Sequence, residues 1–96
     1  MFTAEEAKAN VINYQAAFYA KVNETVTEIL ETMSKSIEFH SRCGLTSAEF
    51  IPYTNSRFPC DKAKEIAQDQ FEKAFKSTGY NIIINDIEKN VLKVSW

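Results

Sequence analysis

The sequence predicts an α+β domain in which a long N-terminal helix, a short strand, a second helix and a C-terminal β-hairpin follow one another (α-β-α-β-β). Three observations predict it: a long run of apolar residues at helical spacing from Thr3 to about Phe39, a second such run over residues 59–78, and two β-branched segments after residue 79. The chain has 96 residues and no internal repeat. We therefore expect residues 1–96 to form one domain with a three-stranded antiparallel sheet.

The first helix has a clear start and a clear stop. Thr3-Ala4-Glu5-Glu6 has the form of a capping box, in which Thr3 accepts a hydrogen bond from the Glu6 amide. Apolar residues then recur at three- and four-residue steps, and no Gly or Pro occurs between Phe2 and Cys43. Gly44 suits the left-handed conformation that ends a helix.

The length of this helix is its most informative property. At 1.5 Å per residue it is about 54 Å long, whereas a second helix of about 30 Å and short strands cover only part of that length. Either the helix bends round its own core, or its uncovered part packs against another subunit, of which a symmetric dimer is the commonest form. Large aromatic residues stand next to alanines in one segment, which lets a second helix approach closely. The predicted subunit interface comprises Tyr14, Phe18, Tyr19 and Val22.

A short strand is expected over residues 46–52. Ala48 and Phe50 share one face of it, and Pro52 indicates an edge strand or the end of the strand, because proline lacks a ladder donor. An irregular polar loop follows over residues 53–58.

The second helix is expected to begin at Pro59, whose fixed φ suits the first helical position, and to end at Gly79. One continuous face is formed by Ala63, Ile66, Ala67, Gln70, Phe71, Ala74, Phe75 and Thr78.

The C-terminal segment is expected to form an antiparallel hairpin, with strands over residues 80–84 and 91–96 and a turn between them. Leu92, Val94 and Trp96 share one face of the second strand. We expect the Trp96 ring to pack beneath the second helix, near Phe71 or Phe75.

The composition excludes several classes of function. Residues 1–39 hold six acidic and three basic residues, and residues 40–96 hold seven acidic and eight basic residues. Neither part is basic enough for general nucleic-acid binding. The N-terminus lacks the pattern of a signal peptide, and no segment has the length and apolarity of a membrane span. We therefore expect a soluble cytoplasmic protein.

The two cysteines are too few for a disulfide scaffold, and we expect free thiols. The alternatives are a Cys43–Cys60 bridge, or a metal site built from His40, both cysteines and Asp61. A structural zinc site normally offers four clear Cys or His ligands, and a Cys-His nucleophile needs an orienting group that no motif supplies here. We expect no metal, no cofactor and no enzymatic activity.

One group of residues has the chemistry of a ligand site. Arg42, Tyr53, Asn55 and Arg57 lie on the two loops that flank the short strand. Arginine offers a forked donor to phosphate or carboxylate, and tyrosine offers a stacking face. These four residues are the candidate site for a small anionic or nucleotide-like ligand; ordinary solvated loop residues are the alternative.

Three short segments carry a resemblance to a known group of proteins. Thr3-Ala4-Glu5-Glu6-Ala7 opens a long helix, Gly79-Tyr80 joins a helix to a strand, and Ser95-Trp96 closes the chain. This pattern resembles small, mostly uncharacterised proteins of tailed bacteriophages. The resemblance implies a viral accessory protein that acts in the host cytoplasm, and it implies no catalytic residues.

The leading hypothesis is therefore a non-enzymatic, oligomeric phage accessory protein that binds a host protein or a defence component. A protein that sequesters a small anionic molecule and a structural component of the virion are the alternatives.

Overall fold

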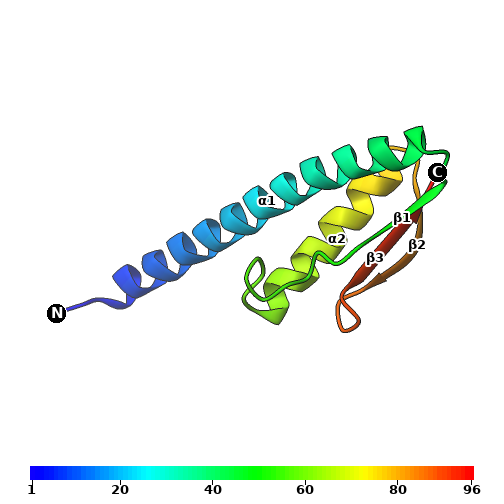
Figure 1. Cartoon of the computed structure of the whole chain (residues 1–96). Helices are drawn as coiled ribbons and strands as arrows, with labels where there is room; N and C mark the ends of the chain where they lie inside the picture. The colour runs from blue at the N-terminus through cyan, green and yellow to red at the C-terminus, as the bar shows by residue number, and fades with distance from the viewer.

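The computed structural model describes all 96 residues and confirms the predicted fold class (Figure 1). Five elements follow in the predicted order: α1 (Ala4–Arg42), β1 (Ser47–Phe50), α2 (Asp61–Ser77), β2 (Asn81–Asp86) and β3 (Val91–Ser95). The molecule measures 65 × 23 × 20 Å, because α1 extends well past everything else in the chain.

Both ends of α1 are made by the residues that the sequence analysis identified. The Thr3 side chain accepts a hydrogen bond of 3.1 Å from the Glu6 amide, and Cys43 and Gly44 follow the last turn. Gly44 has a φ of +82°, a conformation that glycine adopts without steric cost. The helix runs to Arg42, past the expected end near Phe39, since no helix-breaking residue precedes Gly44.

The sheet has the strand order β1-β3-β2, and both outer strands run antiparallel to β3. The predicted edge position of β1 is confirmed. The register of β2 against β3 shifts between Ile82 and Ile84, which marks a β-bulge in the other edge strand. Such irregular edges resist pairing with further strands.

Other boundaries also differ from expectation, and β1 (Ser47–Phe50) is shorter than the expected residues 46–52. The helix α2 begins at Asp61 with extended Cys60 at its cap, so Pro59 lies just before the helix rather than at its first position. The strand β2 continues to Asp86, so the hairpin turn is shorter than expected. Asn85 belongs to the strand because it pairs with Leu92 of β3, and its side chain and carbonyl also bond to Gln68 of α2.

Two helices cover one face of the sheet. Figure 1 shows α1 and α2 lying side by side and running in the same direction, with α1 packed over β1 and α2 over β2. The core between the layers contains Phe58, Phe71, Leu92 and Val94, none of which is exposed to solvent. Burial of this apolar surface stabilises the body.

The Trp96 ring packs against the edge of the core, but its aromatic neighbour is Tyr80 rather than the expected Phe71 or Phe75. It packs edge-to-face on Tyr80, at a centroid distance of 6.2 Å, and Tyr80 packs in turn on Phe75 at 5.5 Å. The Trp96 amide donates to the Thr46 carbonyl across the sheet at 2.9 Å. The last residue is therefore held by an aromatic chain and by one backbone bond.

Candidate functional site

The N-terminal arm, residues 4–21 of α1, projects beyond the body that the rest of the chain forms (Figure 1). Most of its large apolar side chains are exposed: Val11, Ile12 and Tyr14 are 55%, 64% and 71% exposed, whereas Phe18 packs against the edge of the core. The first α1 residue that is buried in the core is Val22. Exposed apolar side chains gathered on one helical segment make the arm a candidate interaction surface.

The arm is helical without tertiary support for two reasons. It is rich in alanine, the best helix former, and it contains neither glycine nor proline. It also extends a helix that the body already holds in place, so no new nucleation is required. The alanines of the arm are Ala4, Ala7, Ala9, Ala16, Ala17 and Ala20.

One line of residues on the arm has the spacing of a coiled-coil seam. The arm seam, defined as Ala4, Ala7, Val11, Tyr14 and Phe18, alternates steps of three and four residues. The Tyr14 and Phe18 rings stack with centroids 6.4 Å apart. Small residues at the tip and large ones toward the body form the surface that a facing helix would meet.

A hollow of about 310 Å³ lies where the arm joins the body. The foot hollow, as we name it, is lined by Tyr14, Gln15, Phe18, Tyr19, Cys60 and Lys62. Its walls therefore come from α1 on one side and from the cap and first turn of α2 on the other. It combines aromatic walls with a lysine at the rim.

The structure divides the predicted subunit interface. Tyr14, Phe18 and Tyr19 lie on the arm, and Phe18 is half-buried against the edge of the core. Val22 belongs to the chain's own core and is inaccessible to a partner. Because α2 and the β1–α2 loop cover α1 from Val22 onward, the available surface lies further toward the N-terminus.

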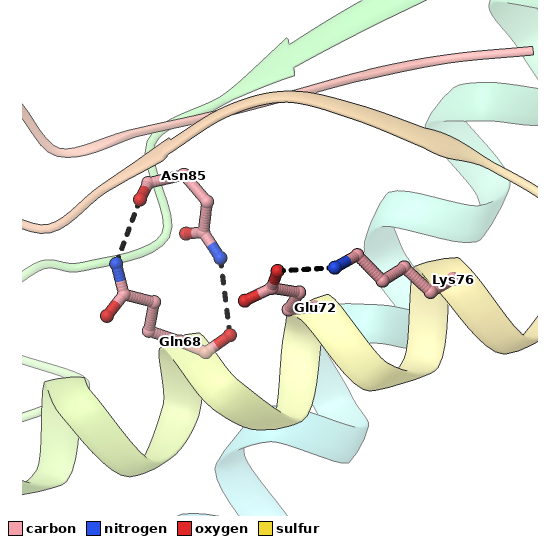
Figure 2. Close-up of polar contacts among 4 residues, drawn as sticks. All are labelled: Gln68, Glu72, Lys76 and Asn85. Atoms are coloured by element: carbon pink, nitrogen blue, oxygen red, sulfur yellow. Dashed lines mark hydrogen bonds and ion pairs between the residues drawn. The ribbon is translucent and has the colours of Figure 1, made fainter.

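A polar cluster fixes α2 against the sheet and explains why Tyr53 is not free to bind a ligand. Gln68 donates from Nε2 to the Asn85 carbonyl at 2.8 Å, and Asn85 donates from Nδ2 to the Gln68 carbonyl at 3.2 Å (Figure 2). The Asn85 Oδ1 atom accepts a hydrogen bond from the Tyr53 hydroxyl. Asn90 Oδ1 accepts from the Tyr53 amide at 2.7 Å.

The electrostatics of Tyr53 are those of a structural group. Burial raises the pKa of its phenol well above the ordinary value, the hydrogen bond to Asn85 opposes that rise, and the Glu72 carboxylate adds to it. Glu72 itself pairs with Lys76 at 2.7 Å on the surface of α2 (Figure 2). The Tyr53 ring packs edge-to-face on Phe71.

The four residues of the predicted ligand site are not gathered in one place. Arg42 pairs with Glu38 at 2.5 Å at the end of α1, and Asn55 accepts a hydrogen bond of 2.7 Å from Lys64. Arg57 lies beside Thr32, ten residues before Arg42, which corresponds to about 15 Å along the helix. Tyr53 faces the core.

Arg57 alone keeps the character of a binding residue. It lines two adjoining hollows along α1, of about 350 and 180 Å³. Their polar lining includes Thr25, Thr32, Thr54 and Ser56, and also the Glu28 carboxylate. No ion pair holds the Arg57 guanidinium.

The two cysteines do not form a joint site, although Cys60 lines the foot hollow. Both thiols are free and exposed, Cys43 after the end of α1 and Cys60 beside Tyr14 and Tyr19 near its middle. Those positions lie about 36 Å apart along the helix, whereas a disulfide requires Cα atoms within about 7 Å. No three His, Cys, Asp or Glu side chains are placed to hold a metal ion.

Sequence reasoning did not identify the foot hollow. Cys60 and Lys62 are more than forty residues from Tyr14 in the chain, and no motif links them. The arm seam was detectable from its spacing, but only the structure shows that its residues stay uncovered.

No known protein family, no curated protein and no solved structure matches this chain. None of its helices combines the length and the apolarity needed to span a membrane.

Proposed function

We propose that this protein is a non-enzymatic binding protein that self-associates through its N-terminal arm, most simply as a dimer. The observation that carries the proposal is the exposed apolar surface of residues 4–21 on a helix whose other half buries one face in the core. Water-exposed Val11, Ile12 and Tyr14 contribute stabilisation only when another surface covers them.

The wider role that we propose is that of an accessory protein that binds a second protein in the host cytoplasm. The resemblance to small proteins of tailed bacteriophages supports that setting. The rigid body supports a binding role, because its polar cluster and packed core hold the outer surfaces in fixed positions. A repetitive assembly in the virion is the alternative use of the same arm.

Light scattering on the purified protein tests self-association. We expect at least twice the chain mass of 11.0 kDa at micromolar concentration. Val11→Asp should give a monomer that still unfolds cooperatively, at the melting temperature that wild type approaches on dilution. A wild-type monomer across the whole concentration range would disprove the proposal. Affinity capture from host lysate with wild type and Val11→Asp side by side then separates partners that need the dimer from those that bind the body.

A second candidate function rests on Arg57. Its unpaired guanidinium and the surrounding hydroxyl groups have the chemistry to hold a small anion. Isothermal titration with inorganic phosphate and with a nucleoside monophosphate tests it, with Arg57→Gln as the variant that should lose binding. Arg42→Gln is the matched control, because Arg42 lies outside the hollow and already has a carboxylate partner.

A further inference from the structure

The arms of two copies have one pairing that the body permits. From Val22 onward, the side of α1 that continues the arm seam is covered by the same chain. Arg57 of the β1–α2 loop lies beside Thr25 and Thr32, and α2 packs along α1 as well. A parallel partner helix that followed the seam would have to enter that space with its own body. An antiparallel partner places the two bodies at opposite ends and avoids this collision.

The foot hollow lies where the tip of an antiparallel partner arm would arrive. The seam has a length of about 21 Å from Ala4 to Phe18 and ends at the hollow. Phe2 lies just before the tip of the arm and is exposed. The hollow has aromatic walls of Tyr14, Phe18 and Tyr19 and a volume of about 310 Å³, so it is suited to an aromatic side chain.

The charges at the two ends of the arm are complementary. The tip carries Glu5 and Glu6, whereas the rim of the hollow carries Lys62. The N-terminus of α2 adds partial positive charge there, because no side chain caps it at Cys60, and the Asp61 carboxylate in the same turn offsets part of that charge. An antiparallel pair brings Glu5 and Glu6 of each copy toward Lys62 of the other. A parallel pair would instead place the acidic tips together.

The exposed apolar area of the two arms is enough for a small dimer interface. Packed aromatic rings bury about 150–250 Å² each, so three partly exposed rings and two aliphatic side chains offer on the order of 500 Å² per arm. A symmetric pair would then bury about 1,000 Å², which reaches the lower limit for a stable interface. The five side chains are Phe2, Val11, Ile12, Tyr14 and Tyr19.

From these observations we infer that two copies pair their arms antiparallel about a two-fold axis, and that Phe2 of each copy occupies the foot hollow of the other. The inference rests on the proposed self-association. It adds the relative direction of the two arms and the residue, Phe2, that anchors each arm to the other copy. The interface is isologous, so each dimer contains two identical anchor sites.

Cross-linking tests the direction of pairing. Within one chain, position 4 lies about 15 Å along α1 from the nearest residue of the hollow, so a short bismaleimide cannot join it to Cys60 of the same chain. In a protein that carries Ala4→Cys and Cys43→Ser, we expect interchain products that join the thiol introduced at position 4 to Cys60. Peptide mapping identifies these products, and the additional Cys60→Ser substitution should abolish them.

Two outcomes of the cross-linking would overturn the inference. Products that join the two introduced thiols at position 4 to each other would indicate parallel arms. A protein that is dimeric by light scattering but gives no product between position 4 and Cys60 would also contradict the antiparallel arrangement, while leaving self-association intact.

Substitution of the anchor tests the role of Phe2. Phe2→Ala should raise the dimer dissociation constant about tenfold or more, because a buried aromatic anchor contributes at least that factor. Phe39→Ala is the matched control: Phe39 is comparably exposed on α1, but it lies at the far end of the helix, and its removal should leave dimerisation unchanged. Equal effects of the two substitutions would overturn the assignment of Phe2 to the hollow. A wild-type monomer would instead remove the proposed function on which the inference rests.

Discussion

The two halves of α1 have the same conformation and similar apolar spacing, yet one half is buried in the core and the other is exposed. Residues 22–42 present Val22, Val26, Ile29, Met33 and Ile37 to the core, and all five are buried. Residues 4–21 present Val11, Tyr14 and Phe18 at comparable spacing, and only Phe18 is partly covered. The difference shows that helical periodicity identifies a surface that can be buried, whereas the number of elements beside the helix decides whether it is.

The difference also separates two kinds of stability. The body is held by tertiary contacts, so its residues set the melting temperature of the chain. The arm is held by alanine-rich helix propensity and by its continuity with the packed half, so its side chains are available to a partner with little loss of stability in the fold. Substitutions in the two regions should therefore change different measurable quantities.

The largest expected effect is that of removing a large ring from the body. Phe71 is fully buried and contacts the Tyr53 and Phe58 rings. Phe71→Ala should lower the free energy of unfolding by about 3–5 kcal/mol, which in a domain of this size removes much of the total. Urea denaturation followed by circular dichroism measures it. Tyr14→Ala is the arm control, and a comparable loss there in the monomeric background would break the distinction between arm and body.

The most direct comparison uses one residue type on the two halves of the same helix. Val26 is 3% exposed, whereas Val11 is 55% exposed. Val26→Ala should lower the free energy of unfolding by about 2 kcal/mol, from lost methyl burial and the residual cavity. At concentrations where both proteins are monomeric, Val11→Ala should leave it unchanged or slightly higher, because alanine favours the helix. At higher concentration the same substitution should weaken self-association. Thermal melts of both variants check stability, and sedimentation checks self-association. The prediction fails if Val11→Ala has a lower melting temperature than Val26→Ala.

A smaller effect is expected from the polar cluster of the body. Asn85→Ala leaves the Tyr53 hydroxyl without its acceptor and removes the bond to the Gln68 carbonyl. One buried unsatisfied group costs about 1–3 kcal/mol, and we expect a value near the middle of that range. Asn81→Ala on the exposed start of the same strand is the control and should have no measurable effect on urea denaturation.

The smallest expected effect on the free energy of unfolding comes from the ionisation of Tyr53, and it is absent at neutral pH. Burial raises the pKa of this phenol above the ordinary value of 10.0, so the folded chain retains a proton that the unfolded chain releases. The associated stability is fully present below pH 10 and is lost as the pH rises above it. The free energy of unfolding of wild type should fall between pH 10 and pH 11 more steeply than that of Tyr53→Phe. Parallel profiles of the two proteins would show that Tyr53 ionises freely in the folded state.

The sequence by itself determined the elements of this protein, because their causes are local. Thr3 and Gly44 mark the ends of α1 through a side-chain cap and a left-handed backbone, and the alternating Leu92 and Val94 indicate which face of β3 is buried. The order of elements and the edge position of β1 followed from such signals. The start of α2 was predicted slightly too early, at Pro59. The residue that caps the helix is Cys60, which has no strong capping preference, so the sequence did not mark this position.

Only the tertiary structure decided which side chains meet. The sequence predicted one ligand site on the two loops that flank the short strand, formed by Arg42, Tyr53, Asn55 and Arg57. In the structure the two ends of that strand are far apart, so Arg42 is separated from the others. Tyr53 faces inward and bonds to Asn85. The foot hollow joins Tyr14 to Cys60 and Lys62, which no local pattern connects. The physical reason is the same in each case: spacing along a helix or strand specifies which face a residue occupies, whereas the packing of distant elements determines whether that face is covered.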